Sequence, residues 1–308
     1  MLTPAMSGLL ERIARAARPS LHALAPQAAR AAYAAGAEIL DLPRAPLARV
    51  EDITLPGGDG RPRPARLYAP SHERLPALLY LHGGGFVIGG IATHDSLCRQ
   101  LALRSGGAVL SLDYRLAPEH RFPAAVEDAW AALAALVAEP SRWGLAERAP
   151  AVGGDSAGGT LAAVSALHAR DCGWPLALQL LITPGTAAQA DTASHRLYAN
   201  GFLLDARTIE WFFEQYIERE QRSDWRFAPL GADVDGVAPA CIVVAECDPL
   251  VDEGIAYADR LRAAGVAVAF EMYRGVTHDF IKMGRALNEA AAAQAFVAAA
   301  LRQAWQAA

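Results

Sequence analysis

The sequence predicts an α/β protein with a mostly parallel central sheet of about eight strands and helices on both faces. Short apolar runs alternate with longer amphipathic stretches along most of the chain. The runs are continuously apolar rather than alternating in polarity, as in strands covered on both faces. The composition, 53% hydrophobic and 20% charged over 308 residues, is that of a globular protein with a sizeable core.

Eight segments carry the strand pattern. After helix-like sequence to about Tyr33, two short strands flank the turn sequence PGGDGRPRP, which predicts a hairpin. The strands of this hairpin are expected at residues 49–55 and 65–68. The other six are expected at residues 77–81, 108–112, 149–152, 176–182, 241–245 and 266–272.

Helical segments separate most of these strands. They are expected near residues 94–105, 124–137, 157–169, 252–264 and 285–305. Strands that alternate with helices form an open parallel sheet with right-handed crossovers.

One interval departs from the alternation. Between Pro184 and about Pro239 there is no strand-like run, only a loop and helical sequence such as residues 206–219. Because this is long for a single crossover, we interpret it as an insertion that forms a lid together with the N-terminal helices. The chain is then a single domain, in which a cap of about 1–45 and about 185–238 covers a core of 46–184 and 239–308.

Charge and composition exclude several classes of partner. The net charge of −5 and the lack of a basic patch with interleaved aromatics argue against nucleic acid. No apolar run approaches the roughly 18 residues of a membrane span, and the N-terminus lacks a signal-peptide core. The Arg-rich residues 11–30 faintly resemble an organelle transit peptide, but a pair of surface helices is the favoured interpretation. We therefore expect a cytoplasmic protein.

The cysteines also favour a reducing compartment such as the cytoplasm. Cys98, Cys172, Cys241 and Cys247 form no CxxC pair and no zinc-finger spacing. They are expected to be free thiols in a reducing compartment, with no metal.

The sequence Gly154-Asp155-Ser156-Ala157-Gly158 fits the pattern G-x-S-x-G between a predicted strand and a predicted helix. In such a nucleophile elbow the serine occupies a sharp, strained turn at the carboxyl end of its strand. The flanking glycines are needed because a Cβ there would strike the neighbouring strand or helix. A glycine-rich turn whose serine caps the helix is the alternative.

A serine hydroxyl needs a base to remove its proton, and only three histidines follow Ser156. His168 is about three helical turns along the helix leaving the elbow, roughly 18 Å away, and cannot reach it. His195 falls in the insertion. His278 follows the strand that ends at Tyr273, where sites on open α/β sheets gather, and is the predicted base.

The base in turn needs an orienting acid, and in this arrangement the chain order is serine, acid, histidine. Asp248 follows the strand at 241–245 and is the predicted acid. Asp252 is better placed to cap or open the next helix. Asp279 adjoins the histidine itself and is poorly placed to bond its imidazole.

The sequence His82-Gly83-Gly84-Gly85-Phe86 directly follows the strand at 77–81. Three glycines let backbone amides approach a ligand. An HGGG loop here supplies oxyanion donors alongside the amide of the residue after the nucleophile, Ala157. Alone, the motif could be a flexible turn; with Ser156, Asp248 and His278 it predicts acyl transfer.

Together these motifs resemble the hormone-sensitive-lipase-like (bacterial family IV) esterases of the α/β-hydrolase superfamily, over roughly residues 75–280. The matching motifs are HGGGF at 82–86, DYRLAPE at 113–119, FPA at 122–124, GDSAGG at 154–159, DPL at 248–250 and His278. The resemblance implies the α/β-hydrolase fold, a helical cap, oxyanion amides from Gly84, Gly85 and Ala157, and no metal or cofactor.

Two positions depart from the pattern of many relatives. Thr183-Pro184 stands where many carry Tyr-Pro, and His278-Asp279-Phe280 where many carry His-Gly-Phe. Neither is a triad position, but either could reshape the acyl pocket.

The predicted function is a carboxylesterase that takes small-molecule esters of short to medium acyl chains. Its activity should fall as His278 protonates below the ordinary histidine pKa of about 6.5. Hydrolysis of an amide, carbamate or lactone is the alternative reaction. A non-catalytic receptor on the same scaffold is disfavoured by the presence of His278. The sequence leaves open whether the protein forms a homodimer. An apolar substrate pocket is expected from Phe86, Phe202, Leu203, Leu204, Trp211, Phe212, Phe280 and Ile281.

Overall fold

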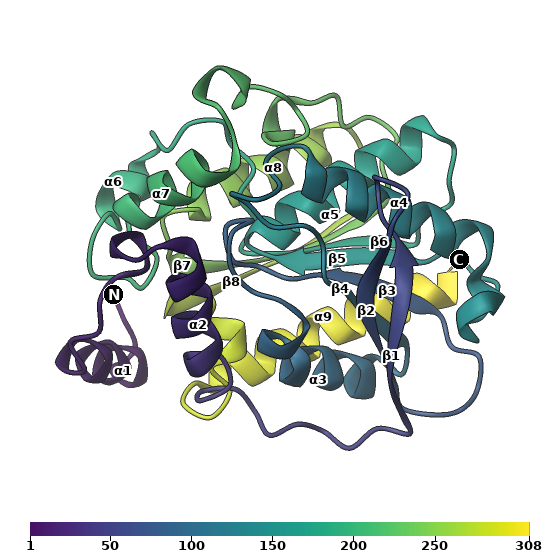
Figure 1. Cartoon of the computed structure of the whole chain (residues 1–308), viewed down its shortest axis with the longest axis horizontal. Helices are drawn as coiled ribbons and strands as arrows, with labels where there is room; N and C mark the ends of the chain where they lie inside the picture. Colours follow the sequence, from purple (N-terminus) through teal and green to yellow (C-terminus); the bar gives the residue numbers. More distant parts are fainter. Residues whose placement is uncertain (308) are drawn as a thin grey trace.

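A computed structural model describes residues 1–307 of the chain (Figure 1). Within these residues a single sheet of eight strands runs in the order β1-β2-β4-β3-β5-β6-β7-β8. The strands are β1 Arg49–Pro56, β2 Pro62–Ala69, β3 Ala77–Leu81, β4 Ala108–Leu112, β5 Ala151–Asp155, β6 Leu178–Ile182, β7 Ala240–Cys247 and β8 Val268–Thr277. β2 pairs antiparallel with both β1 and β4, and the pairs from β4 to β8 are parallel. The predicted hairpin and the mostly parallel sheet are confirmed.

Helices cover both faces of the sheet, with α4, α5 and α8 on one face and α3 and α9 on the other (Figure 1). The helices are α1 Pro4–Arg15, α2 Pro26–Gly36, α3 Asp95–Ser105, α4 Ala124–Ala138, α5 Ala157–Asp171, α6 Ala193–Leu197, α7 Ala206–Tyr216, α8 Val251–Ala263 and α9 Asn288–Ala307. Within residues 1–307, no helix has both the length and the apolar character needed to cross a membrane.

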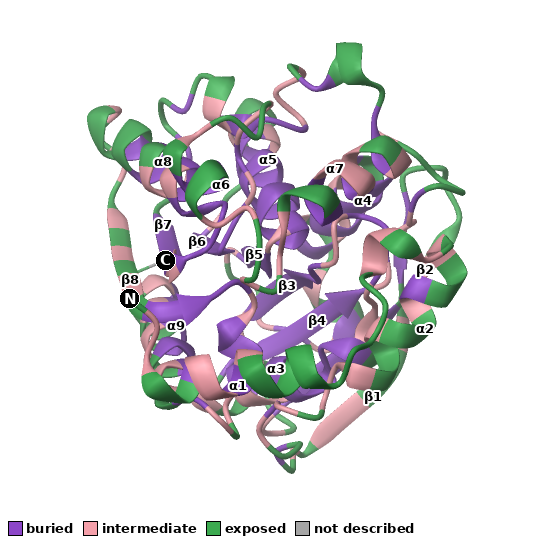
Figure 2. Ribbon diagram, turned by 90° about the vertical axis from the view of Figure 1, so that its left-hand side faces the viewer, coloured by how far each residue is buried: buried purple, intermediate pink, exposed green. Residues whose placement is uncertain are grey.

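Each face of the sheet packs its own hydrophobic core, and the central strands β3, β4, β5 and β6 are buried along their whole length (Figure 2). Along β3, Leu79 and Leu81 join the core beneath α4 and α5, whereas Leu78 and Tyr80 join the core beneath α3 and α9. Alternate side chains of a strand point to opposite faces, so a strand covered on both sides must be apolar at every position. This explains the continuous apolar runs of the sequence.

Several strand boundaries differ from the expected ones, and two strands, β5 and β8, run three or more residues past their expected carboxyl ends. β5 runs to Asp155 and includes Gly153 and Gly154, because backbone pairing with β3 and β6 needs no side chain. A Cβ on Gly154 would overlap the carbonyl oxygen of Leu81 in β3. β8 continues to Thr277, beyond its apolar stretch, through a register shift opposite β7.

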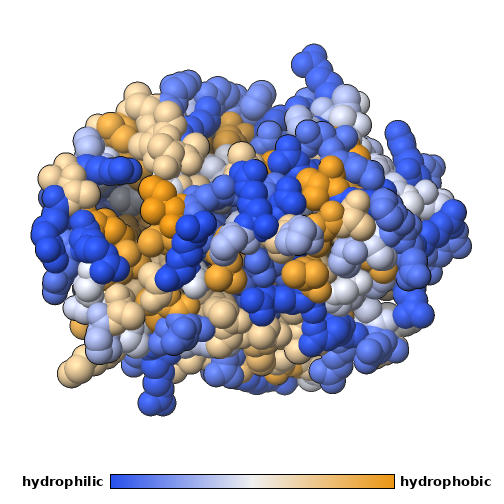
Figure 3. Space-filling model, turned by 90° about the horizontal axis from the view of Figure 1, so that it is seen from below, coloured by the Kyte–Doolittle hydropathy of each residue, from blue (hydrophilic) through white to orange (hydrophobic). Residues whose placement is uncertain are grey.

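The segments expected to form the cap lie at one end of the sheet. Figure 1 shows α2, α6 and α7 gathered there, and α7 packs against the short 3₁₀ helix η1, Leu21–Ala23. α1 lies apart from them, because its Met6 and Leu9 join the core on the α9 side and Thr3 hydrogen-bonds Gly275 of β8. The surface in Figure 3 is mostly hydrophilic, with hydrophobic side chains gathered around a hollow at this same end.

A substitution in the first turn of α5 tests how closely this helix approaches the sheet. A Cβ on Gly158 would overlap the backbone carbonyl of Leu81, which cannot move without disturbing β3. We expect Gly158→Ala to lower the free energy of unfolding by about 1–3 kcal/mol, measured by urea denaturation. Gly8→Ala in α1 is the control: it meets no atom within 4 Å, so stability should be unchanged or rise by up to about 1 kcal/mol. Equal stabilities for the two variants would contradict the close approach.

Candidate active site

Ser156 forms the turn between β5 and α5. Its backbone has φ 53° and ψ −120°, a left-handed conformation that costs a non-glycine residue about 1–3 kcal/mol. The Ser156 amide donates to the carbonyl of Ile182 at 2.8 Å, and its carbonyl accepts from the amide of Thr160 at 3.1 Å. These bonds fix the strained turn, and the serine side chain lines a cavity.

His278 and Asp248 reach Ser156 from the ends of β8 and β7. His278 Nε2 lies 2.9 Å from Ser156 Oγ, and His278 Nδ1 lies 2.7 Å from Asp248 Oδ2. Since a carboxylate only accepts, Nδ1 carries the proton in the neutral imidazole, and Nε2 is then left to accept from the serine hydroxyl. The Asp248 carboxylate is fully buried and also accepts from the amide of Leu250 at 2.9 Å. The structure thus brings together the three residues predicted to act as nucleophile, base and acid.

The other residues that were weighed for these roles lie elsewhere. His168 stacks on the ring of Trp130, with centroids 3.9 Å apart. Asp252 accepts from the amide of Ser194 at 2.8 Å, and Asp279 approaches His278 Nε2 only to 4.0 Å. His195 bonds Thr192, as described below.

The protonation of His278 depends on its carboxylate partner. Burial lowers the pKa of the imidazole, but the charge and hydrogen bond of Asp248 outweigh it, with smaller contributions from Asp279 and Asp155. The net effect raises the pKa of His278 to about 9. The site therefore stabilises an imidazolium strongly, which is the state that a base reaches after taking the serine proton.

The predicted oxyanion residues Gly84, Gly85 and Ala157 line the same cavity as Ser156. Within residues 1–307 their amides have no hydrogen-bond acceptor, whereas the amide of Gly83 donates to Asp155 Oδ1 at 3.1 Å. Amides without a partner are rare in folded proteins and indicate a place for a ligand. A side chain on Gly85, at φ 59°, would overlap the ring of Phe212.

A buried network beneath the glycines holds them in place. Asp155 Oδ1 accepts from Tyr80 at 2.5 Å as well as from Gly83, and Oδ2 lies 3.2 Å from His94 Nε2. Burial raises the pKa of the Asp155 carboxyl, but the charge and hydrogen bond of His94 outweigh it, so the pKa lies well below its usual value. Sequence reasoning missed this role, although an acid beside the nucleophile in a buried strand was a signal for it.

The cavity has a volume of about 290 Å³ and mostly apolar walls. Of the side chains expected there, Phe86, Leu203, Leu204 and Phe212 line it. Residues of the N-terminal and inserted segments that the sequence did not single out complete the wall, among them Leu21, Tyr33, Ile209, Phe213 and Phe227.

Four side chains expected in this pocket do not line it. Phe280 and Ile281 belong to the 3₁₀ helix η6, Phe280–Lys282, and both are buried in the core on the α9 side. Trp211 precedes Phe212 on α7 and so points about 100° away around the helix. Phe202 packs edge-on against Tyr198. The helical phase of α7 accounts for Trp211, and the structure corrects the expectation for all four side chains.

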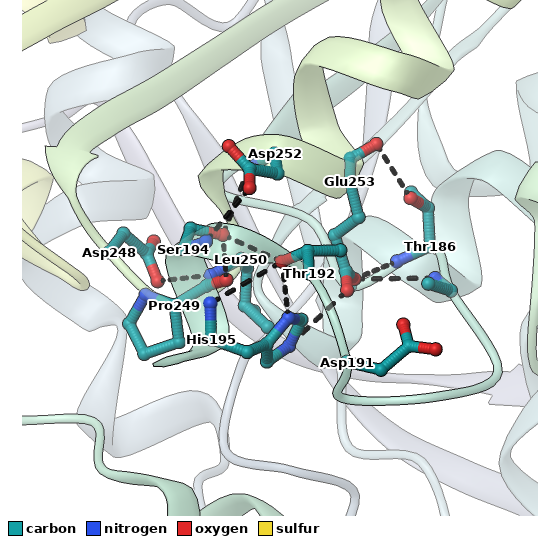
Figure 4. Close-up of polar contacts among 12 residues, drawn as sticks. Thr186, Asp191, Thr192, Ser194, His195, Asp248, Pro249, Leu250, Asp252 and Glu253 are labelled. Atoms are coloured by element: carbon teal, nitrogen blue, oxygen red, sulfur yellow. Dashed lines mark hydrogen bonds and ion pairs between the residues drawn. The ribbon is translucent and has the colours of Figure 1, made fainter. Parts of the chain in front are cut away.

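Both segments that were expected to form a cap contact loops of the site. Arg30 of α2 donates to the carbonyls of Val87 at 2.8 Å and Ala117 at 2.7 Å, just past the glycine loop. On the other side, Ser194 Oγ of α6 donates to the carbonyl of Pro249 at 2.6 Å, next to Asp248 (Figure 4).

His195 of α6 takes part in the same contacts between the inserted segment and the site. Its Nδ1 lies 2.7 Å from Thr192 Oγ1, and its Nε2 lies 3.5 Å from Glu253 Oε2 (Figure 4). Glu253 Oε1 in turn accepts from the amides of Thr186 and Ala187. His195 therefore joins the inserted segment to α8.

Comparison with known proteins agrees with the fold and identifies the family. A family model described as alpha/beta hydrolase fold matches residues 78–282. The chain is 43% identical to ethyl acetate hydrolase of Pseudomonas putida over 263 residues, 82% of each chain. It is 40% identical to carboxylesterase NlhH of Mycobacterium tuberculosis over 275 residues, 84% of each chain.

Solved structures similar to this chain are also esterases. An ester hydrolase from the metagenome of Lake Arreo, EH1AB1, complexed with a bipyridine phosphonate derivative, superposes with a TM-score of 0.94 at 39% identity, covering 98% of this chain and 99% of that one. The hyperthermophilic esterase of Pyrobaculum calidifontis gives 0.93 at 39% identity, with 98% of each chain covered. The fold and site thus define an α/β-hydrolase. The chain belongs to the hormone-sensitive-lipase-like (bacterial family IV) esterases of that superfamily.

Removal of the Asp155 carboxylate tests the buried network. We expect Asp155→Ala to lower the free energy of unfolding by about 3–5 kcal/mol, because Tyr80, His94 and the Gly83 amide lose a buried charged partner. Asp171→Ala, which breaks an exposed pair with Arg170, should cost at most about 1 kcal/mol. Urea denaturation of both variants measures the difference, and similar losses would contradict the structural role of Asp155.

Proposed function

We propose that the protein is a carboxylesterase that hydrolyses short- to medium-chain acyl esters through a covalent acyl-enzyme. The observation that carries the proposal is the chain of contacts from Ser156 Oγ through His278 to Asp248, beside three amides of one cavity that have no acceptor in the described part of the chain. The esterase names of the relatives support the same bond specificity over amide, carbamate or lactone hydrolysis.

In the first half-reaction, His278 Nε2 takes the proton of Ser156 as Oγ attacks the ester carbonyl carbon. The carbonyl oxygen becomes an oxyanion, which accepts from the amides of Gly84, Gly85 and Ala157. Ala157 also begins α5, so the positive end of the helix dipole adds to this stabilisation. The imidazolium then gives its proton to the leaving alcohol oxygen, and the acyl group stays on Ser156.

In the second half-reaction, water replaces the alcohol. His278 removes a proton from the water, which attacks the acyl carbon, and the same amides bind the second oxyanion. Return of the proton to Ser156 Oγ releases the carboxylic acid. Asp248 holds the imidazole in one tautomer through both halves and does not become protonated.

The size of the cavity supports short to medium acyl chains. Its volume of about 290 Å³ lies at the lower limit of the roughly 300–1,000 Å³ typical of ligand sites. Leu21 and Tyr33 from the N-terminal segment and Leu204 and Phe212 from the inserted segment close its wall. We propose that these two segments act together as the cap over the core.

The proposed location is cytoplasmic. All four cysteines are free, and Cys98, Cys241 and Cys247 are buried. Thiols without disulfide partners are typical of reducing compartments.

The nucleophile and the chain-length preference are tested with 4-nitrophenyl acetate, butyrate, octanoate and palmitate. We expect kcat/KM to be highest for the acetate or butyrate and lowest for the palmitate. Ser156→Ala should lower the rate on every ester by about 10⁶-fold. Equal rates for the two proteins would refute Ser156, and a maximum at palmitate would refute the short-chain preference.

The pH dependence follows from the charge on His278. The base must be neutral to accept the serine proton, and its pKa is raised to about 9, so kcat/KM should rise with pH up to about 9 rather than level off near 6.5. Asp248→Asn removes the charge that raises this pKa. The variant should reach its plateau at a lower pH, with kcat reduced on the order of 10⁴-fold. A profile that is the same in both proteins would contradict the role of Asp248.

A further inference from the structure

Of the two departures from the family pattern, only one faces the cavity. Thr183 is buried and does not line it. Asp279 does line it, with its side chain 30% exposed and its Oδ1 4.0 Å from His278 Nε2. Its backbone lies in the left-handed region at φ 61°, where glycine is the least strained residue. The chain therefore carries a carboxylate beside the base, at a position where glycine would fit without strain.

The carboxylate of Asp279 is only weakly engaged by the rest of the protein. Within residues 1–307 it accepts no hydrogen bond, and its one ion-pair contact is the 4.0 Å approach to His278. Lys282, buried behind the cavity wall, donates its Nζ to the hydroxyl of Tyr33 at 2.9 Å and makes no ion pair with Asp279. No lysine or arginine is among the residues that line the cavity.

The other carboxyl of the wall is already engaged. Glu253 accepts from the backbone amides of Thr186 and Ala187, and burial raises its pKa to about 8, so it is mostly neutral at pH 7. Asp279 is then the carboxylate of the described cavity wall that accepts no hydrogen bond; it interacts electrostatically with His278 and with the buried Lys282, whose pKa values it raises.

The position of Asp279 indicates which half of an ester it meets. In the proposed mechanism His278 Nε2 hands its proton to the oxygen of the leaving alcohol. A group that lies 4.0 Å from Nε2 is beside this oxygen and its substituent. The Asp279 carboxylate attracts a cationic group there, and the attraction is strong because the rest of the cavity wall is mostly apolar and screens charge less than water does.

We propose that Asp279 is a specificity-determining residue that selects esters whose alcohol part carries a positive charge, such as esters of amino alcohols. This inference rests on the proposed esterase function and adds the class of substrate to it.

The test compares two butanoate esters of the same shape, 2-(trimethylammonio)ethyl butanoate and its neutral isostere 3,3-dimethylbutyl butanoate. The measured quantity is the ratio of their kcat/KM values by pH-stat at pH 8. Both esters use the same triad, so the ratio cancels any effect of a substitution on His278 itself. The variants are Asp279→Asn and Asp279→Gly, with Asp259→Asn on the exposed face of α8 as the matched control for loss of one charge.

We expect the ratio to fall about tenfold in both Asp279 variants and to stay unchanged in Asp259→Asn. In the wild type it should also fall when NaCl is raised to 0.5 M, because salt screens the attraction. An unchanged ratio in Asp279→Asn, or an equal fall in Asp259→Asn, would overturn the proposal while leaving the esterase function intact. If the wild type cleaves neither these esters nor 4-nitrophenyl butyrate, the esterase function itself fails, and this proposal with it.

Discussion

The left-handed turn at Ser156 is the constraint on which the site depends. Within one residue the chain leaves a buried strand and enters a helix, and this lifts the hydroxyl above the edge of the sheet. The turn fits only because Gly154 and Gly158 carry no side chain to strike the carbonyl of Leu81. Backbone hydrogen bonds to Ile182 and Thr160 stabilise the strained conformation of Ser156. The local cost is therefore offset by the packing of β3, β5, β6 and α5.

The parallel sheet supplies the remaining groups at the same edge. Since β5, β7 and β8 run in one direction, the residues that follow them meet, although Ser156 and His278 are far apart in the chain. The glycine loop follows β3 at this edge and is fixed through Asp155, the residue next to the serine. Arg30 connects the N-terminal segment to this loop, and Ser194 connects the inserted segment to the turn after Asp248.

The sequence predicted the parts of the site that depend on chain order and strand ends. Ser156, Asp248 and His278 each follow an apolar run, and their types are those that acyl transfer needs. It predicted less of what depends on contacts between distant segments. Trp211 and Phe212 look alike in sequence, but only the helical phase decides which of them faces the cavity. Tyr33 and the partners of Asp155 could not be found without the packing of α2 and β3, and the high pKa of His278 needed the burial of its carboxylate partner.

The most direct measurement is a crystal structure of the protein after reaction with an alkyl phosphonate, which mimics the tetrahedral intermediate. The account predicts phosphorus bonded to Ser156 Oγ and the phosphoryl oxygen within hydrogen-bond distance of the amides of Gly84, Gly85 and Ala157. Phosphorus on another residue, or a phosphoryl oxygen turned away from these amides, would contradict it.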